Sequence, residues 1–255
     1  MTIALGIDIG GTGIKGALVD TATGKLATDR LKLFTPKGGD PDDVVAVTLQ
    51  LIERLGGVPE GAPVGICVPA VVKGGTTLTA ANISKKWIGL DAKGAFEQAI
   101  GREITILNDA DAAGYAELHF GAAKDVPGLV FLTTLGTGIG TAPIYDGVLL
   151  PNTELGRIEL DGEIAETRAS YGAMERDDLD WKHWAKRLDR YYGYLESLFF
   201  PDLFIVGGGV SKNALEFLPL LTIRTPIVPA VHRNNSGILG AAALAAANAG
   251  AARRG

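Results

Sequence analysis

Two glycine-rich turns in this chain have the composition of a phosphate-binding site. The first is Gly10-Gly11-Thr12-Gly13, which follows the carboxylate of Asp8 and precedes Lys15. The second is Gly136-Thr137-Gly138, about half the chain further on. Turns lined by glycine expose backbone N–H groups that no side chain shields, and such groups can hold phosphate oxygens. One turn of this kind is a weak signal, but two in similar settings suggest a duplicated fold that holds one polyanion from both sides.

The first turn also matches the dinucleotide-binding pattern G-x-G-x-x-G through Gly11, Gly13 and Gly16. That pattern requires a helix directly after the glycines. Residues 14–20 instead read as a strand and reach another turn too soon for a crossover helix. We therefore reject a Rossmann fold, and the lack of a Gly-x4-Gly-Lys-Ser/Thr motif rejects a P-loop. An ordinary hairpin remains the alternative for this turn, although a hairpin needs only two turn residues.

Asn108 and Asp109 form a second candidate site, because they directly follow the predicted strand at residues 103–107. Both residue types are favoured helix caps, and spacing alone leaves capping as an equal alternative. A carboxylate at the carboxyl end of a strand also points into the crevice where α/β proteins bind ligands. There it could accept the proton of an attacking hydroxyl group. Asp8 ends the first strand in the same way and could hold a phosphate-bound Mg²⁺ through water.

The composition excludes several classes of protein. With 255 residues, 47% of them hydrophobic, the chain can bury a sizeable core in one or two domains. Its formal net charge of −5 argues against a nucleic-acid or membrane-surface partner, since both require an excess of basic residues. The single cysteine, Cys67, excludes an intrachain disulfide. No apolar stretch has the length of a membrane span or a secretion signal, so we expect a soluble cytoplasmic protein.

The elements that must position these residues occur in the order three strands, helix, strand, helix, strand, and this order occurs twice, the second time with an insertion. In the first half the expected elements are strands at 3–9, 14–20 and 25–34, a helix from about 41 to 55, a strand at 64–68, a helix at 91–100 and a strand at 103–107. In the second half they are strands at 129–135, 139–145 and 148–150, a long helix over 181–198, a strand at 203–206 and a last helix ending near 252. This order predicts an α/β fold of mixed sheets covered by helices, with a cleft between two halves.

At these residues the chain resembles the ROK family of sugar kinases, and most closely the short members that use polyphosphate. The resemblance covers essentially the whole chain through five motifs in the family's order, at residues 8–16, 106–114, 136–140, 150–156 and 201–209. It implies the actin-like ATPase fold, a duplicated ribonuclease H-like fold whose two lobes border a central cleft. We expect residues 1–107 with 238–255 to form the small lobe, and residues 108–237 the large one.

The resemblance also implies roles for single residues. Asp109 matches the general base that acts on the 6-hydroxyl group of the sugar. The residues implied to contact the other sugar hydroxyls are Asn82, Asn108, Glu154, Arg157 and Glu166. Those implied to contact the phosphates or the nucleotide are Gly10, Gly11, Thr12, Lys15, Thr137, Gly138, Gly207, Gly208 and Gly209. Asp8 is the implied Mg²⁺ ligand, acting through water.

Two departures from the family pattern affect the sugar site. Most of the family has histidine where this chain has Arg157, and arginine can neither accept a hydrogen bond nor lose its charge at ordinary pH. The family's cysteine-rich zinc loop is missing, as its short members lead us to expect. Glu166 is the best match to a sugar-binding glutamate that follows this loop in longer relatives, and Glu163 is the alternative.

The resemblance therefore implies transfer of a terminal phosphoryl group, with Mg²⁺, from polyphosphate or ATP to the 6-hydroxyl of glucose and of mannose. A long polyphosphate needs positive charge beyond a triphosphate site, and the candidates are Lys85, Lys86, Lys182, Lys186, Arg187 and Arg190. Charges at this spacing are also typical of a solvated helix face. The alternatives are a sugar-sensing regulator, for which the predicted strand at Ile3 leaves no room for an N-terminal DNA-binding module, and a kinase for an N-acylated amino sugar. Both a monomer and a homodimer are compatible with the sequence.

Overall fold

The structure is a computed structural model and describes residues 3–81 and 83–252. The chain forms two compact units. Unit 1 comprises Met1–Ala116 and Asn235–Gly255, and unit 2 comprises Glu117–Asn234. Within the described ranges, no helix is both long enough and apolar enough to cross a lipid bilayer.

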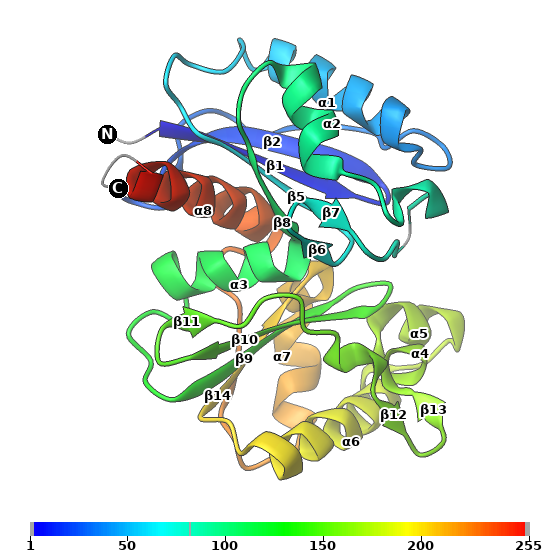
Figure 1. Cartoon of the computed structure of the whole chain (residues 1–255). Helices are drawn as coiled ribbons and strands as arrows, with labels where there is room; N and C mark the ends of the chain where they lie inside the picture. Colours follow the sequence, from blue (N-terminus) through cyan, green and yellow to red (C-terminus); the bar gives the residue numbers. More distant parts are fainter. Residues whose placement is uncertain (1–2, 82, 253–255) are drawn as a thin grey trace. The chain divides into compact units, whose positions relative to one another are not determined.

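Unit 1 is built on a mixed sheet with the strand order β3-β2-β1-β5-β8 (Figure 1). Its strands are β1 (Ile3–Gly10), β2 (Gly13–Asp20), β3 (Lys25–Leu26), β5 (Val64–Val68) and β8 (Thr105–Asn108), and β4 (Leu31–Leu33) pairs with β2. The first two strands form a hairpin, whereas β1, β5 and β8 run parallel to one another. The carboxyl ends of these three parallel strands therefore share one edge of the sheet.

Unit 2 repeats this topology in the order β11-β10-β9-β14-β15. Its strands are β9 (Leu129–Leu135), β10 (Ile139–Tyr145), β11 (Val148–Leu149), β14 (Leu203–Gly207) and β15 (Ile227–Pro229). With β4 left aside, the third, second, first, fourth and fifth strands along the chain are neighbours in that order in both sheets, and the last three are parallel. The predicted duplication is confirmed.

One strand prediction was wrong. The third strand, expected over residues 25–34, is divided into β3 and β4. After Leu26 the hydroxyl of Thr28 accepts a hydrogen bond from the backbone N–H of Leu18 at 3.1 Å. The Thr28 hydroxyl thus takes the place of a backbone carbonyl as the acceptor for an N–H group of β2. The regular ladder of backbone hydrogen bonds is interrupted until residue 31.

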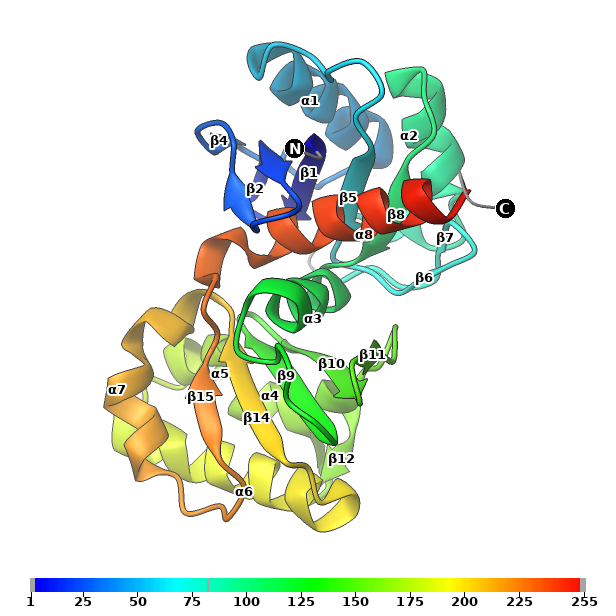
Figure 2. The ribbon, with the colours of Figure 1, turned by 90° about the vertical axis from the view of Figure 1, so that its left-hand side faces the viewer.

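Helices cover both faces of the unit 1 sheet. Helices α1 (Pro41–Arg54) and α2 (Ala92–Ile100) lie on one face, and α8 (Ser236–Ala252) lies along the other (Figure 2). The α1/α2 face buries Ile7, Ile66, Trp87 and Phe96. Next to them are η1 (Lys85–Trp87) and the hairpin β6–β7 (Val72–Lys73 and Thr76–Thr77), and α3 (Asp109–Phe120) follows β8. Apolar burial on both faces stabilises the sheet that contains Asp8 and that ends, in β8, directly before Asp109.

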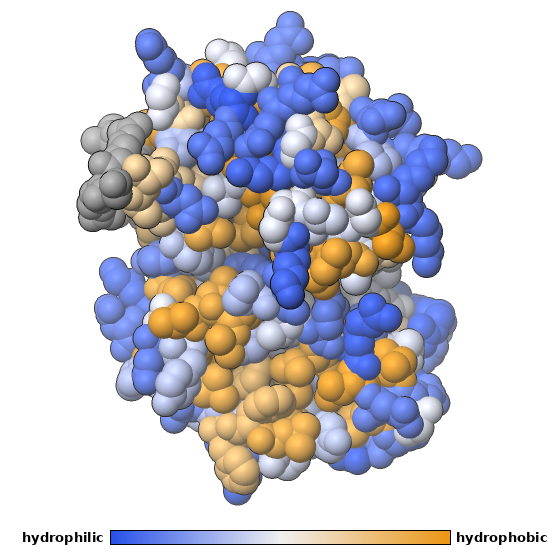
Figure 3. Space-filling view, in the orientation of Figure 1, coloured by the Kyte–Doolittle hydropathy of each residue, from blue (hydrophilic) through white to orange (hydrophobic). Residues whose placement is uncertain are grey.

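In unit 2, helix α6 (Trp181–Phe199) contributes more residues to the buried core than any other element. The apolar side of this helix is fully buried at Trp184, Leu188, Tyr191 and Leu195, whereas Trp181 is partly exposed and Leu198 is exposed. The predicted insertion before this helix contains η2 (Leu155–Arg157), β12 (Glu159–Leu160), β13 (Glu163–Ile164), α4 (Ala165–Ala169) and α5 (Tyr171–Arg176), and η3 (Gly209–Asn213) and α7 (Ala214–Phe217) follow β14. Apolar residues also occupy extended areas of the visible surface of unit 2 (Figure 3).

Candidate functional site

Two acidic residues of unit 1, Asp8 and Asp109, lie at the edge where the carboxyl ends of its three parallel strands meet. Asp8 in β1 pairs with Cys67 in β5, and Cys67 pairs with Leu107 in β8. Asn108 and Asp109 follow at the end of β8, so Asp8 and Asp109 are separated by two strand spacings, roughly 10 Å. This is the edge at which α/β sheets bind their ligands.

Asp8 and Lys15 face each other across the first hairpin. The Lys15 ammonium donates to Oδ2 of Asp8 at 3.0 Å, and the two residues are register partners in β1 and β2. The thiol of Cys67 lies 3.7 Å from the other carboxylate oxygen of Asp8. Burial raises the pKa of this thiol well above its usual value, and the charges of Asp8 and Asp109 raise it further. Cys67 is therefore a buried, protonated thiol between two carboxylates.

Asn108 forms the cap of α3. Its Oδ1 accepts hydrogen bonds from the backbone N–H groups of Ala110 at 2.8 Å and Asp111 at 3.2 Å. Its amide donates to the Ala70 carbonyl at 3.1 Å. The capping interpretation is thus confirmed for Asn108, and capping does not exclude a ligand on its second N–H. Asp109 begins the helix, where its Oδ1 accepts from Ala110 N–H at 2.9 Å.

The first glycine turn is a hairpin with two residues at its tip. Gly10 and Gly13 are paired, and Gly11 and Thr12 are exposed between them. The hydroxyl of Thr35 donates to the Gly10 carbonyl at 2.5 Å and ties the hairpin to the segment after β4. Because β2 rather than a helix follows the turn, the rejection of a dinucleotide-binding fold is confirmed. Asn82, the remaining sugar-site candidate of this unit, lies outside the described residues.

In unit 2, two glycine segments lie at one edge of the sheet. The second turn, Gly136–Gly138, follows β9, and Gly207-Gly208-Gly209 ends the neighbouring parallel strand β14. Gly208 has φ +82°, and a Cβ there would lie 2.4 Å from the Leu135 carbonyl oxygen. Only glycine permits both this conformation and this approach. Backbone N–H groups from two turns are thereby gathered at one edge.

The insertion holds the second turn in place. Oε2 of Glu166, on α4, accepts a hydrogen bond from the Ile139 N–H at 3.0 Å. The N–H of Gly172, in α5, donates to the Gly136 carbonyl at 2.9 Å. Gly172 was not predicted to take part, although Ser170 two residues earlier is a recognisable helix cap that accepts from Ala173 N–H. Two short helices thus position the turn and place a carboxylate beside it.

Glu154, Arg157 and Glu166 lie within electrostatic reach of one another. Partial burial raises the pKa of Glu154, the charge of Glu166 raises it further, and Arg157 acts in the opposite direction. A Cβ on Gly156 would lie 2.2 Å from the Ile139 carbonyl oxygen, so the turn that carries Glu154 and Arg157 packs directly on β10. Glu163 instead forms an ion pair with Arg168 at 2.7 Å. The structure therefore brings Glu166 close to Glu154.

Within the described part of the chain, no group of three or more histidine, cysteine or acidic side chains forms a metal site. Mg²⁺ does not require such a group, because it commonly binds through one or two carboxylates together with waters and substrate phosphates. A single carboxylate such as Asp8, close to a turn with exposed backbone N–H groups, fits that kind of site.

Comparison with known proteins places these features in context. The sequence profile described as "ROK family" matches residues 4–164. A polyphosphate glucokinase of Mycobacterium tuberculosis (strain CDC 1551 / Oshkosh) is 48% identical over 238 residues, which cover 93% of this chain and 89% of that protein. The crystal structure of an inorganic polyphosphate/ATP-glucomannokinase from Arthrobacter sp. strain KM has a TM-score of 0.94 and 48% identity, with 97% of this chain and 100% of that chain covered. A ROK family glucokinase from Streptomyces griseus, solved with glucose and AMPPNP, has a TM-score of 0.79 and 25% identity, with 99% and 100% covered.

Proposed function

The chain belongs to the ROK family, and we propose that it transfers the terminal phosphoryl group of polyphosphate or ATP to the 6-hydroxyl of glucose and of mannose. The observation that carries this proposal is the 48% identity, over nearly the full length of both chains, to relatives named for polyphosphate and glucose. The arrangement of carboxylates and glycine turns at the carboxyl ends of parallel strands supports it.

On this proposal, Asp109 is the general base. Its carboxylate accepts the proton of the sugar's 6-hydroxyl as the oxygen attacks the terminal phosphorus. The sugar's other hydroxyls bind to Asn82, Asn108, Glu154, Arg157 and Glu166, which supply both donors and acceptors. Phosphoryl transfer needs little covalent chemistry from the protein, so positioning and charge stabilisation supply most of the rate enhancement.

We assign the glycine segments of each unit to the phosphoryl donor. Backbone N–H groups of Gly10, Gly11, Thr12, Thr137 and Gly138 hold the phosphates with Lys15, and Gly207, Gly208 and Gly209 lie beside the nucleotide or the more distant phosphates. Asp8 would hold Mg²⁺ through water, and the ion would neutralise charge on the phosphates. The ion pair with Lys15 keeps the Asp8 side chain oriented at the strand end.

The test is an assay of the purified protein with two donors and three sugars. We expect Mg²⁺-dependent phosphorylation of glucose and mannose with ATP or long-chain polyphosphate, and little product from N-acetylmannosamine. A preference for N-acetylmannosamine would assign the chain to the amino-sugar kinases instead. Binding of sugar without turnover, with either donor, would favour a sugar sensor.

The second glycine turn offers a test of donor binding that leaves the fold intact. A Cβ on Gly136 would meet no atom within 4 Å, so Gly136→Ala fits the free protein. The methyl group should nevertheless block close approach of a phosphate to the backbone. We expect the donor KM to rise roughly tenfold or more, the effect of losing one hydrogen bond to a charged group, with the melting temperature unchanged.

Gly193→Ala, in α6 and equally free of contacts, is the matched control. An unchanged donor KM in Gly136→Ala would remove this turn from the donor site.

We propose that Arg157 keeps Glu154 ionised for sugar binding. Arg157 lowers the pKa of Glu154, against the raising effects of burial and Glu166. Arg157→Gln removes this influence, so the Glu154 pKa should rise and the acid limb of the pH profile of kcat/KM for glucose should move to higher pH. Arg54→Gln, in α1 of the other unit, removes the same charge as a control. An acid limb that stays in place, or moves to lower pH, contradicts this role.

A further inference from the structure

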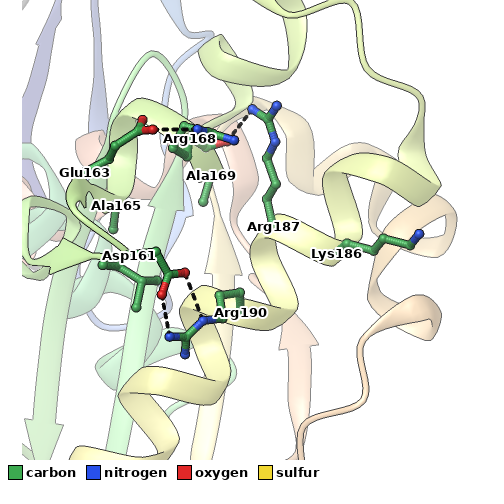
Figure 4. A pocket seen from close by; sticks show the side chains of 9 residues that line it. Asp161, Glu163, Ala165, Arg168, Ala169, Lys186, Arg187 and Arg190 are labelled. Carbon is green, nitrogen blue, oxygen red and sulfur yellow. Dashed lines mark hydrogen bonds and ion pairs between the residues drawn. The ribbon is translucent and has the colours of Figure 1, made fainter.

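A cavity of about 230 Å³ in unit 2 is lined by four cationic side chains (Figure 4). These cations are Arg168 on α4 and Lys186, Arg187 and Arg190 on α6. Two carboxylates also line it, Asp161 in the turn between β12 and β13, and Glu163. The cations thus outnumber the carboxylates in the lining, although the chain as a whole has a net charge of −5.

The cationic lining is built by two helices that are fixed to each other. Lys186 and Arg190 are four residues apart on α6 and so share one side of the helix. The buried indole N–H of Trp184, also on α6, donates to the carbonyls of Ala169 at 3.0 Å and Ser170 at 3.1 Å, at the end of α4. Lys182, one turn before Lys186, does not line the cavity. The sequence pattern therefore suggested Lys182, which does not line the cavity, and missed Arg168, which does.

Carboxylates hold the three arginines without using all their donors. Arg190 binds Asp161 through Nε at 3.1 Å and Nη2 at 2.8 Å. Arg168 donates to Glu163 at 2.7 Å through Nη1, and Nη1 of Arg187 donates to Asp177 at 2.6 Å. Each guanidinium has five N–H groups, so donors remain for a further anion. In the described ranges of the chain Lys186 forms no ion pair and is exposed, and its ammonium points away from the three arginines (Figure 4). Its flexible side chain must therefore change rotamer to join them at a bound phosphate.

The cavity lies next to the helix that supports the second glycine turn. Helix α4 contributes Ala165, Arg168 and Ala169 to the cavity lining, while Glu166 of the same helix accepts from Ile139 directly after the turn. An α-helix with its side chains is about 10 Å wide. The cavity is therefore one helix away from a turn assigned to the donor phosphates. A triphosphate bound at the turn would not need it, but a longer phosphate chain could reach it.

We propose that this cavity is a second binding site for the distal phosphates of a polyphosphate donor, and that ATP does not use it. This inference rests on the proposed function, from which it takes the polyphosphate and the position of its reacting end. Guanidinium groups in fixed positions bind phosphate oxygens through paired N–H donors, and the free lysine adds a mobile point charge. The site favours long donors because only they carry phosphates beyond the glycine turns.

The experiment compares Lys186→Glu with Lys182→Glu, two equal charge reversals one turn apart on α6. Steady-state KM is measured for long-chain polyphosphate and for ATP at several salt concentrations. We expect Lys186→Glu to raise the polyphosphate KM roughly 3- to 10-fold at low salt and to reduce the slope of log KM against log salt by about one, as for a lost phosphate contact in a linear polyanion. The ATP KM and the kcat with ATP should stay unchanged. Lys182→Glu should have a clearly smaller effect on polyphosphate.

Three results would contradict the proposed site. The first is an equal effect of the two charge reversals on the polyphosphate KM, and the second is no effect of either reversal on it. The third is a rise of the ATP KM in Lys186→Glu as large as the rise of the polyphosphate KM. If glucose is phosphorylated with neither donor, the proposed function fails separately. The site is then still tested by titrating fluorescently labelled long-chain polyphosphate into the wild type and both variants, where weaker binding in Lys186→Glu alone supports it and equal binding in all three rejects it.

Discussion

We expect Asp109→Asn to lower kcat for glucose phosphorylation by roughly 10²- to 10⁴-fold, the range for loss of a general base. The proton of the 6-hydroxyl must leave as the oxygen attacks phosphorus, and an amide cannot accept it. Glucose and donor KM should change much less, because the amide has nearly the shape of the carboxylate. The measurement is steady-state kinetics with saturating donor, at matched protein concentration and with melting temperatures recorded for both proteins.

The structure gives this substitution a clear interpretation. Oδ1 of Asp109 accepts the Ala110 N–H at 2.9 Å, and the carbonyl oxygen of asparagine can accept the same bond. The start of α3 should therefore stay intact, helped by the Asn108 cap. Asp42→Asn, at an exposed position in the first turn of α1, changes the net charge equally and should leave kcat unchanged. A kcat for Asp109→Asn within a factor of a few of the wild type would remove Asp109 from the proton transfer.

The local elements of this fold could be predicted from sequence because their determinants are local. The hairpin β1–β2 follows from β-forming runs on both sides of Gly11 and Thr12, and α1 begins at Pro41 after Asp40, as the cap and first-turn residues indicate. The equal order of elements in the two halves predicted equal sheets, and the observed strand orders confirm this. The break after β3 was missed because a side-chain hydroxyl, Thr28, replaces a backbone partner.

For the candidate site, the sequence located strand ends but not the contacts between distant segments. Asp8 and Asp109 each end a predicted strand, so a shared edge could be inferred. The choice between Glu163 and Glu166 could not be made by spacing, since both follow β12 closely. The structure places one in an ion pair with Arg168 and the other against Ile139. The contact of Glu166 with Ile139 joins residues 27 positions apart, which no local pattern encodes.

The position of α8 is the other feature that depends on distant contacts. Its alanine-rich sequence predicts a helix but has no apolar stripe to orient it, because the helix is buried along much of its length. Small residues in the sheet and in the helix determine where α8 packs. A Cβ on Gly65 in β5 would lie 1.9 Å from the Ala241 carbonyl oxygen, and one on Gly6 in β1 would lie 2.0 Å from that of Ile238. The two glycines thus let the helix backbone lie directly on the sheet.

We therefore expect Gly65→Ala to lower the free energy of unfolding by about 3 kcal/mol or more, at or above the upper end for overpacked cores, because the obstacle is backbone and cannot rotate away. The sheet and α8 must separate to admit the methyl group, and this disturbs the strand next to Asp8 as well. Urea unfolding followed by circular dichroism measures the change, and Gly6→Ala should show a similar loss. Gly193→Ala adds the same methyl group in open space within α6 and should be neutral or stabilising by up to about 1 kcal/mol. If Gly65→Ala unfolds at the same urea concentration as Gly193→Ala, the close packing of α8 on the sheet is wrong.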